Sequence, residues 1–266
     1  MTIVVITGAA SGIGAGLARH AASLGMRLVL ADWDEAALAE VADSLFTEVL
    51  ALPTDVRDEA AVQALAKAAY DRFGEVDLLF NNAGVLSSGL SWEIDGTTWK
   101  RSLDVNIGGV VNVIRAFVPR LIAADRPSRI VNTSSLGGFL TSPFMAPYSA
   151  TKFAIVAITE ALAGELATQG CKVQVSLLAP GPVKSAIMDE QAPSQTAEFM
   201  TMMRSMTSEN GMTPDEFAPL VFASIARGEY WIVPQPEFLD TGLRDRTDMI
   251  LNRTPPTSFL VVGHQE

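Results

Sequence analysis

The chain has 266 residues, 48% of them apolar, and its 19 Lys and Arg against 30 Asp and Glu give a net charge of −11. One α/β domain would account for this length. So acidic a surface opposes nonspecific binding to nucleic acid or to an anionic membrane. No apolar run is expected to be long enough for a transmembrane segment. One cysteine and two histidines exclude a disulfide framework, leave too few ligands for a Cys/His zinc or other metal site, and fit a cytoplasmic protein.

Apolar, β-branched runs alternate with helical patterns along most of the chain. The expected strands are residues 2–7, 27–31, 49–52, 76–81, 129–134, 173–178 and 230–233. The expected helices are residues 12–24, 34–45, 59–73, 98–124, 148–169 and 214–227. Several strands are apolar throughout, which is typical of strands covered by helices on both faces. The alternation predicts one domain, residues 1–234, with a doubly wound parallel sheet of about seven strands.

Two segments depart from this alternation. Residues 186–212 hold six of the ten methionines, and methionine side chains adapt to irregular apolar shapes. We expect a lid there that closes over an apolar substrate, although packed core or a partner contact would explain the same composition. Residues 235–266 form a C-terminal extension that covers the pocket or packs on the same domain or a neighbouring subunit. An amphipathic helix is expected in it, with apolar positions Phe238, Leu239, Leu243, Ile250 and Leu251.

The first predicted strand runs directly into a glycine-rich turn and then an Ala-rich helix. Glycine permits a close approach of the backbone to a ligand, and a helix N-terminus offers free N–H groups to a phosphate. The spacing is Gly-x-x-x-Gly-x-Gly, which differs from the Gly-x-Gly-x-x-Gly dinucleotide pattern. A merely tight strand–helix turn is the alternative. The expected ligand-binding residues of this turn are Gly8, Ser11, Gly12, Ile13 and Gly14.

Asp32 ends the second predicted strand, eighteen positions after Gly14. An acidic residue near this position accepts hydrogen bonds from the adenosine ribose of a dinucleotide. Its carboxylate would repel a 2′-phosphate, and neither of the next two residues, Trp33 and Asp34, is basic. The pattern therefore favours NAD over NADP as cofactor. The alternative is that Asp32 caps the following helix.

Tyr148 is followed four residues later by Lys152, a spacing that places both on one face of a helix. An ordinary phenol has a pKa of about 10. A unit charge about 4 Å away is worth about 4 kcal/mol at an effective dielectric of 20, or roughly three pKa units. The pair thus predicts a phenol with a pKa near 7, suited to general acid/base catalysis.

Taken together, these motifs resemble the short-chain dehydrogenase/reductase family over residues 2–234. The resemblance also rests on the pair Asp55-Val56, on Asn81-Asn82-Ala83-Gly84, on Asn106, on Ser135 thirteen residues before Tyr148, and on Pro180-Gly181 with Val183 and Ser185. It implies a single-domain Rossmann fold and a catalytic tetrad of Asn106, Ser135, Tyr148 and Lys152, with Ser134 the less favoured serine. The cofactor contacts that it implies are Asp55, Val56, Asn82, Ala83, Gly84, Tyr148, Lys152, Pro180, Gly181, Val183 and Ser185.

The resemblance implies hydride transfer between NAD and an alcohol or ketone. Tyr148 would exchange the proton, Ser135 would hold the substrate oxygen, Lys152 would hold the nicotinamide ribose, and Asn106 would anchor a water relay. For each polar residue a structural role is the alternative: Ser135 as the cap of a strand end, and Asn106 as a buried partner at a helix kink.

The expected substrate is a hydrophobic, bulky or aromatic secondary alcohol or ketone, although Lys184 and Arg204 could enter the site. The expected substrate contacts are Ser135, Leu136, Phe139, Phe144, Met145, Tyr148 and Met188. An NADP-preferring hydroxysteroid or aromatic-ketone reductase is the alternative enzyme, and a dinucleotide-sensing regulatory protein the alternative without catalysis. The long helices resemble those that build family dimers and tetramers, so a homodimer or homotetramer is expected.

Overall fold

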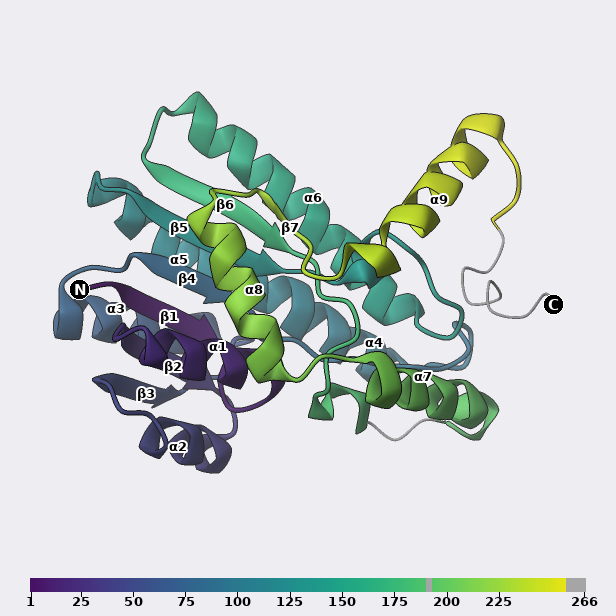
Figure 1. Ribbon diagram of the computed structural model, residues 1–266, viewed down its shortest axis with the longest axis horizontal. Coiled ribbons are helices and arrows are strands. Elements are labelled where there is room, and N and C mark those ends of the chain that lie inside the picture. The colour runs from purple at the N-terminus through teal and green to yellow at the C-terminus, as the bar shows by residue number, and fades with distance from the viewer. Residues whose placement is uncertain (190–192, 257–266) are drawn as a thin grey trace.

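Seven parallel strands form the centre of the fold within the part that the computed structural model describes, residues 1–189 and 193–256. Their order across the sheet is β3-β2-β1-β4-β5-β6-β7 (Figure 1). The strands are β1 (Ile3–Thr7), β2 (Arg27–Asp32), β3 (Val49–Pro53), β4 (Leu78–Asn81), β5 (Ser128–Thr133), β6 (Val173–Leu178) and β7 (Trp231–Ile232). The predicted doubly wound parallel sheet of a Rossmann fold is confirmed.

Helices cover both faces of this sheet. The helices of the described residues are α1 (Gly12–Ser23), α2 (Glu35–Asp43), α3 (Glu59–Phe73), α4 (Gly96–Leu103), α5 (Val110–Ala123), α6 (Ala146–Thr168), α7 (Ala197–Asn210), α8 (Pro214–Ala226) and α9 (Asp240–Asn252). Side chains of β1 alternate between the two faces, as the two-residue period of a strand requires. Val4 and Ile6 pack with α1 and α8, whereas Val5 packs with α3 and α5. Apolar side chains on both faces of the strands thus form two cores.

The long helix expected at residues 98–124 has a π-helical turn inside it, Asp104–Gly109, between α4 and α5. Such turns insert an extra residue into a helix and occur frequently at functional sites. Here the turn carries Asn106, which is fully buried.

The continuous helix Gly96–Ala123 is 28 residues long and reaches a mean hydropathy of 1.4, so by length and composition alone it could cross a membrane. Its apolar stretch is nevertheless interrupted by charged residues, among them Asp104, Arg115 and Arg120, so it is no clear transmembrane span. Its apolar side chains pack within the protein and do not need lipid as a partner. Val113, Ala116, Phe117 and Leu121 are buried against the sheet and α3. We interpret it as a core helix of the α/β fold.

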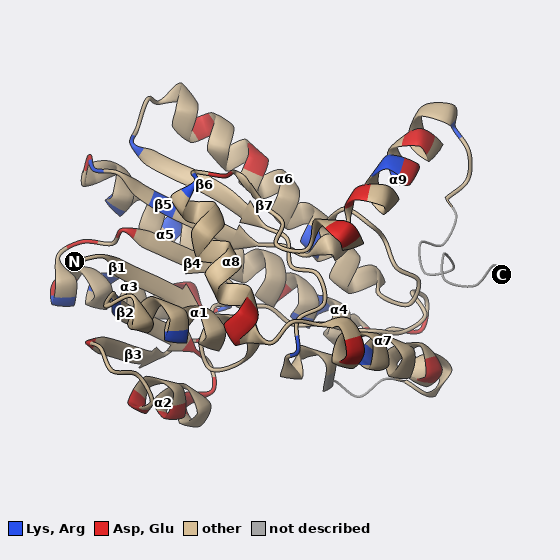
Figure 2. Cartoon of the chain, viewed as in Figure 1, with Lys and Arg blue, Asp and Glu red and all other residues tan. Residues whose placement is uncertain are grey.

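Residues after β7 form a short 3-10 turn, Pro236–Phe238, and then α9, which extends away from the sheet (Figure 1). The helix begins two residues later than the expected amphipathic pattern, so Phe238 and Leu239 precede it. Leu239 is buried, but no residue of α9 itself is. Acidic and basic residues alternate along α9 (Figure 2), and Arg246 lies over the ring of Phe153 in α6.

Candidate functional site

A cavity of about 820 Å³ lies at the carboxyl ends of the central strands. Strand order reverses between β1 and β4, and ligands of open α/β sheets bind outside the carboxyl ends at such a point. The structure brings most of the predicted site residues into this cavity. They are Gly8, Ser11, Gly12, Ile13, Asp32, Asp55, Val56, Asn82, Ala83, Gly84, Ser135, Leu136, Met145, Tyr148, Lys152, Pro180, Gly181, Val183, Ser185 and Met188.

The glycine-rich turn leaves no room for side chains at the positions where the sequence has none. Gly8 and Gly12 have φ of +68° and +51°, a conformation that other residues rarely adopt. A Cβ on Gly14 would lie 1.9 Å from the carbonyl oxygen of Gly8, so this residue lies behind the turn and outside the cavity lining. The first turn of α1 has no acidic residue, and its N-cap, Ser11, makes no side-chain capping bond. The turn therefore offers free N–H groups to an anion.

Asp32 is held at the end of β2 by two backbone donors. Its Oδ2 accepts from the N–H of Ala10 at 3.0 Å and its Oδ1 from the N–H of Asp34 at 3.1 Å. Asp34, and not Asp32, caps α2, because it accepts from the N–H of Ala37. The alternative assignment of Asp32 as a helix cap is therefore excluded, and its carboxylate remains in the cavity wall.

The strand end of β4 is bound to the glycine turn. Thr7 Oγ1 accepts from the N–H groups of Asn82 and Ala83, and Asn82 Nδ2 donates to the carbonyl oxygen of Thr7 at 3.1 Å. Asn81 is buried and donates to the carbonyl oxygen of Val110 and to Asn132 Oδ1. Asn81 therefore joins β4 to β5 and α5, while Asn82 fixes the shape of the cavity wall.

Tyr148 and Lys152 project from the first two turns of α6 toward Ser135, which follows β5. The Ser135 hydroxyl hydrogen-bonds the Tyr148 phenol, and Ser135 Oγ also accepts from the N–H of Gly137. The Lys152 ammonium lies 5.7 Å from the centroid of the Tyr148 ring and donates to the carbonyl oxygen of Thr133 at 3.1 Å. The site thus combines a phenol, a hydroxyl and a buried cation.

Burial controls the acidity of this pair. It raises the pKa of the Tyr148 phenol, and the hydrogen bond from Ser135 acts in the opposite direction. Burial also lowers the pKa of Lys152 to about 8. The expected phenol pKa near 7 is therefore wrong for the protein alone. The lysine charge attracts the phenolate, but the desolvation of both groups, which the sequence does not show, opposes this effect.

Asn106 lies beside this site but outside the cavity lining. Its Oδ1 accepts from the N–H of Val85 at 2.8 Å, and its Nδ2 donates to the carbonyl oxygen of Val85 and to Thr151 Oγ1. The side chain therefore joins the π-helical turn to α6 and to the loop after β4. These bonds agree with the alternative role of Asn106 as a buried partner at a helix kink. A water relay at Asn106 stays a prediction.

Two aromatic residues expected to contact substrate lie outside the cavity lining. Phe139 packs against Val110, Ile155 and Leu177 and makes an edge contact with Trp231. Phe144 has φ of +64°, and its ring lies 5.2 Å from that of Phe199. Contact of either ring with a substrate stays a prediction.

In the methionine-rich segment, residues 186–212, some methionines are packed in the core and others line the cavity. Met200, in α7, is fully buried with Leu86 and Met145, whereas Met203 and Met206, one helical turn apart, line the cavity. Arg204 Nε donates to the carbonyl oxygen of Met188, which joins α7 to the 3-10 turn Ala186–Asp189. Neither Lys184 nor Arg204 lines the cavity. A lid movement stays a prediction, and residues 190–192 and 257–266 lie outside the described part of the chain.

Several cavity residues were missed by sequence analysis. Among them are Trp33, Thr54, Arg57, Arg101, Thr133 and Ser149. The hydroxyl oxygens of Thr133 and Ser149 are buried and have no hydrogen-bond partner among the described residues. Thr133 could have been found from the sequence, because it ends a predicted strand next to Ser135. Phe238 lines the cavity from the C-terminal extension, for which covering the pocket was one of the expected roles.

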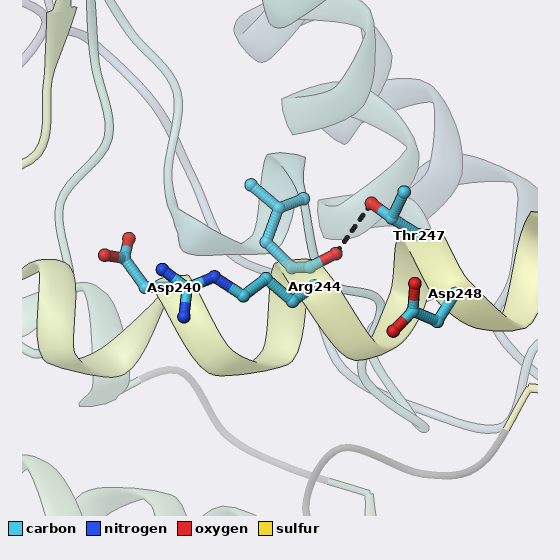
Figure 3. A pocket seen from close by; sticks show the side chains of 5 residues that line it. Asp240, Arg244, Thr247 and Asp248 are labelled. Atoms are coloured by element: carbon cyan, nitrogen blue, oxygen red, sulfur yellow. Dashed lines mark hydrogen bonds between the residues drawn. The ribbon is translucent and has the colours of Figure 1, made fainter.

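A second hollow, of about 550 Å³, lies beside α9 (Figure 3). All five residues that line it belong to this one helix, including Arg244 and Asp248. A hollow built from one exposed helix has no opposing wall to hold a ligand. Residues 1–189 and 193–256 also contain no cluster of three or more His, Cys, Asp or Glu placed to bind a metal ion.

We expect Gly14→Ala to lower the free energy of unfolding by about 1–3 kcal/mol, because the new Cβ overlaps the Gly8 carbonyl. Gly164→Ala in α6 is the matched control, since its Cβ would meet no atom within 4 Å. This control should be neutral or stabilising by up to about 1 kcal/mol. Urea unfolding of both variants measures the difference, and equal stabilities would contradict the packing described for the turn.

Known proteins share both the sequence and the fold. The family whose model matches residues 2–196 is described as short chain dehydrogenase. The 1-deoxy-11-beta-hydroxypentalenate dehydrogenase of Streptomyces avermitilis is 35% identical, over 86% of this chain and 82% of its own length. The CLA biosynthesis dehydrogenase/reductase of Lactiplantibacillus plantarum is 29% identical, over 98% of this chain and 97% of its own length.

Among solved structures, a short-chain dehydrogenase/reductase from Burkholderia phymatum in complex with NAD superimposes with a TM-score of 0.91. It is 39% identical, and the match covers 97% of this chain and 96% of that one. The chain belongs to the short-chain dehydrogenase/reductase family of oxidoreductases.

Proposed function

We propose that this protein transfers a hydride between NAD and a hydrophobic, bulky or aromatic secondary alcohol or ketone, with Tyr148 as the general acid/base. One observation carries the proposal: the phenol of Tyr148, the hydroxyl of Ser135 and the ammonium of Lys152 share a cavity with the glycine turn and Asp32. A reactive end and a nucleotide-binding end of one cavity are what hydride transfer from a dinucleotide requires.

The residues of the cavity fit a dinucleotide. The turn at Gly8 and Gly12 has the space and the free N–H groups for a pyrophosphate. At the other end, the unpartnered hydroxyls of Thr133 and Ser149 can bond to polar groups of a ligand. Lys152, directly beside Thr133, would hold the ribose next to the nicotinamide. NAD, when bound there, supplies or accepts the hydride.

The chain's own residues handle the proton and the oxygen. Burial keeps the Tyr148 phenol protonated at neutral pH, so it can donate its proton to the oxygen of a ketone as the C–H bond forms. In the oxidative direction the phenolate takes the hydroxyl proton of the alcohol. Ser135 Oγ, bonded to Tyr148, would orient the same substrate oxygen, and the Lys152 ammonium stabilises negative charge on either oxygen.

The choice of NAD rests on Asp32. Its carboxylate lines the cavity at the end of β2, where a 2′-phosphate would meet a negative charge. Arg57 lines the same end, but its guanidinium bonds to the carboxylate of Asp55. The NAD complex of the Burkholderia phymatum relative supports the same choice. These observations favour NAD over the NADP-preferring alternative.

The substrate class rests on the outer part of the cavity. Leu86, Met145, Met188, Met203 and Phe238 provide an apolar wall from five separate segments of the chain. Such a wall binds apolar groups by burying them, and methionine adapts to irregular shapes. Two relatives named as dehydrogenases, one of a hydroxypentalenate, agree with a hydroxyl or keto substrate.

We expect Tyr148→Phe to lower kcat at least about 100-fold, because the variant keeps the ring but loses the transferable proton. The measurement is NADH absorbance with a panel of aliphatic, aromatic and steroidal secondary alcohols. Tyr70→Phe is the matched control, since the Tyr70 hydroxyl is buried without a partner and lies outside the cavity. Undiminished turnover by Tyr148→Phe would refute the acid/base role.

A second experiment tests the cofactor. We expect Asp32→Asn to raise the ratio of kcat/KM for NADP to kcat/KM for NAD about tenfold or more, because it removes the charge that opposes a 2′-phosphate. Asp34→Asn is the control, since asparagine is an equally good helix cap and Asp34 does not line the cavity. Equal affinity of the unmodified protein for NAD and NADP would refute the argument from Asp32.

A further inference from the structure

Gln235 lies between β7 and the 3-10 turn Pro236–Phe238, where the C-terminal extension begins. It is only 1% exposed, although glutamine is mostly found at protein surfaces. Its Nε2 donates to the carbonyl oxygen of Pro182 at 3.0 Å, whereas its Oε1 is buried without a hydrogen-bond partner among the described residues. The buried amide thus makes one bond and leaves one polar atom unsatisfied.

The segment that accepts this bond belongs to the wall of the cavity. Gly181 and Pro182 both line the cavity, whereas Gln235 does not. A Cβ on Gly181 would lie 2.8 Å from Gln235 Oε1, so the amide is packed directly behind this part of the wall. Gln235 therefore supports the wall from outside the cavity.

The same segment is bonded to the reactive end of the cavity. The N–H of Leu136, the residue after Ser135, donates to the carbonyl oxygen of Pro180 at 3.0 Å. Residues 180–182 are thus held on one side by the turn that carries Ser135 and on the other side by Gln235. Both bonds therefore set the position of this wall relative to the reactive hydroxyl.

Packing alone does not explain an amide at this place. A buried polar atom without a partner costs stability, and an apolar side chain of similar length, such as methionine, would avoid that cost. Pro182 does not need Gln235 to be satisfied, because its carbonyl oxygen also accepts from the N–H of Met212 at 3.1 Å. The bond from Gln235 therefore fixes the orientation of the Pro182 carbonyl and adds little to the stability of the fold.

We propose that Gln235 is a positioning residue, which holds residues 180–182 in the place that receives the nicotinamide end of the cofactor. It acts through Pro182 and contacts neither cofactor nor substrate. The inference rests on the proposed use of NAD, and it adds a residue that lies beyond residues 2–196, the part that the family model matches. It predicts that loss of the amide weakens binding of the nicotinamide half of NAD and spares the adenine half.

The test replaces Gln235 by methionine, which keeps the length of the side chain and removes the donor. We expect Gln235→Met to weaken binding of NAD about fivefold, as for the loss of one hydrogen bond that holds a binding surface. ADP-ribose, which lacks the nicotinamide, should bind within about twofold of its affinity for the unmodified protein. Calorimetry measures both affinities in the protein without substrate.

Gln63→Met is the matched control. Gln63, on α3, accepts from Arg120 at 3.2 Å and does not line the cavity. The same substitution there also removes one side-chain hydrogen bond, but it should leave the affinities for NAD and ADP-ribose unchanged. An equal loss of NAD affinity in both variants would overturn the inference.

Urea unfolding of the same proteins separates positioning from support of the fold. We expect Gln235→Met to unfold at the same urea concentration as the unmodified protein or at a higher one, because the variant removes the unsatisfied oxygen. Equal weakening of NAD and ADP-ribose, with or without a loss of stability, would show a merely structural role and overturn the inference. An unchanged affinity for NAD would overturn it as well.

These measurements need no alcohol, so they distinguish the inference from the proposed reaction. A protein that shows the selective loss in Gln235→Met but oxidises no alcohol would contradict the reaction and uphold the positioning role. A protein that oxidises alcohols with NAD and keeps its NAD affinity in Gln235→Met would uphold the reaction and overturn the positioning role.

Discussion

The ammonium of Lys152 donates to the carbonyl oxygen of Thr133, and the arrangement of the reactive end depends on this contact. The lysine is 3% exposed, and a buried cation with few partners is costly. The backbone of the same residue is also fixed, because Ser134 Oγ donates to its carbonyl oxygen at 2.8 Å. Consecutive residues at the end of β5 thus hold the side chain and the backbone of Lys152. This places Tyr148, one turn earlier on α6, next to Ser135.

The lysine also constrains its neighbours. A Cβ on Gly84 would lie 3.4 Å from the Lys152 ammonium and 3.3 Å from Asn106 Oδ1, so a side chain there would crowd both. The side-chain amide of Asn106 hydrogen-bonds Val85 and Thr151 and thereby keeps the π-helical turn against α6. Asn82 performs a similar task at the other end of the cavity, where it ties β4 to the turn after β1. Both ends of the cavity are therefore shaped by buried polar contacts.

The sequence predicted the sheet and the positions of its strands because continuous apolar runs indicate strands covered on both faces. It also located Gly8 and Asp32 from the glycine turn and the strand end that follow the apolar runs, and Tyr148 and Lys152 from their helical spacing, whereas Ser135 came only from the resemblance to the family. It missed features that depend on the direction of a side chain. Phe144 has a positive φ and does not line the cavity, and the sequence pattern predicts neither. The helical pattern of residues 98–124 likewise gave no sign of the π-helical turn at Asp104–Gly109.

The acidity of the pair was mispredicted for a different reason. Spacing gives the attraction between Lys152 and Tyr148, but only the folded protein shows how fully both are removed from water. Burial raises the pKa of the phenol and lowers that of the ammonium to about 8. Because the folded protein holds the lysine proton less tightly than the unfolded chain does, the stability contributed by this group increases as the pH rises from about 8 toward its ordinary 10.5.

The most direct test of this account is an NMR titration of the Lys152 side-chain amine in the protein alone, with the signal assigned by its loss in Lys152→Arg. The account predicts a midpoint near pH 8, well below the ordinary value of 10.5, because the ammonium is buried beside the Thr133 carbonyl. A midpoint at the ordinary 10.5 would show a solvated lysine and would contradict the buried phenol–ammonium arrangement on which the proposed chemistry depends.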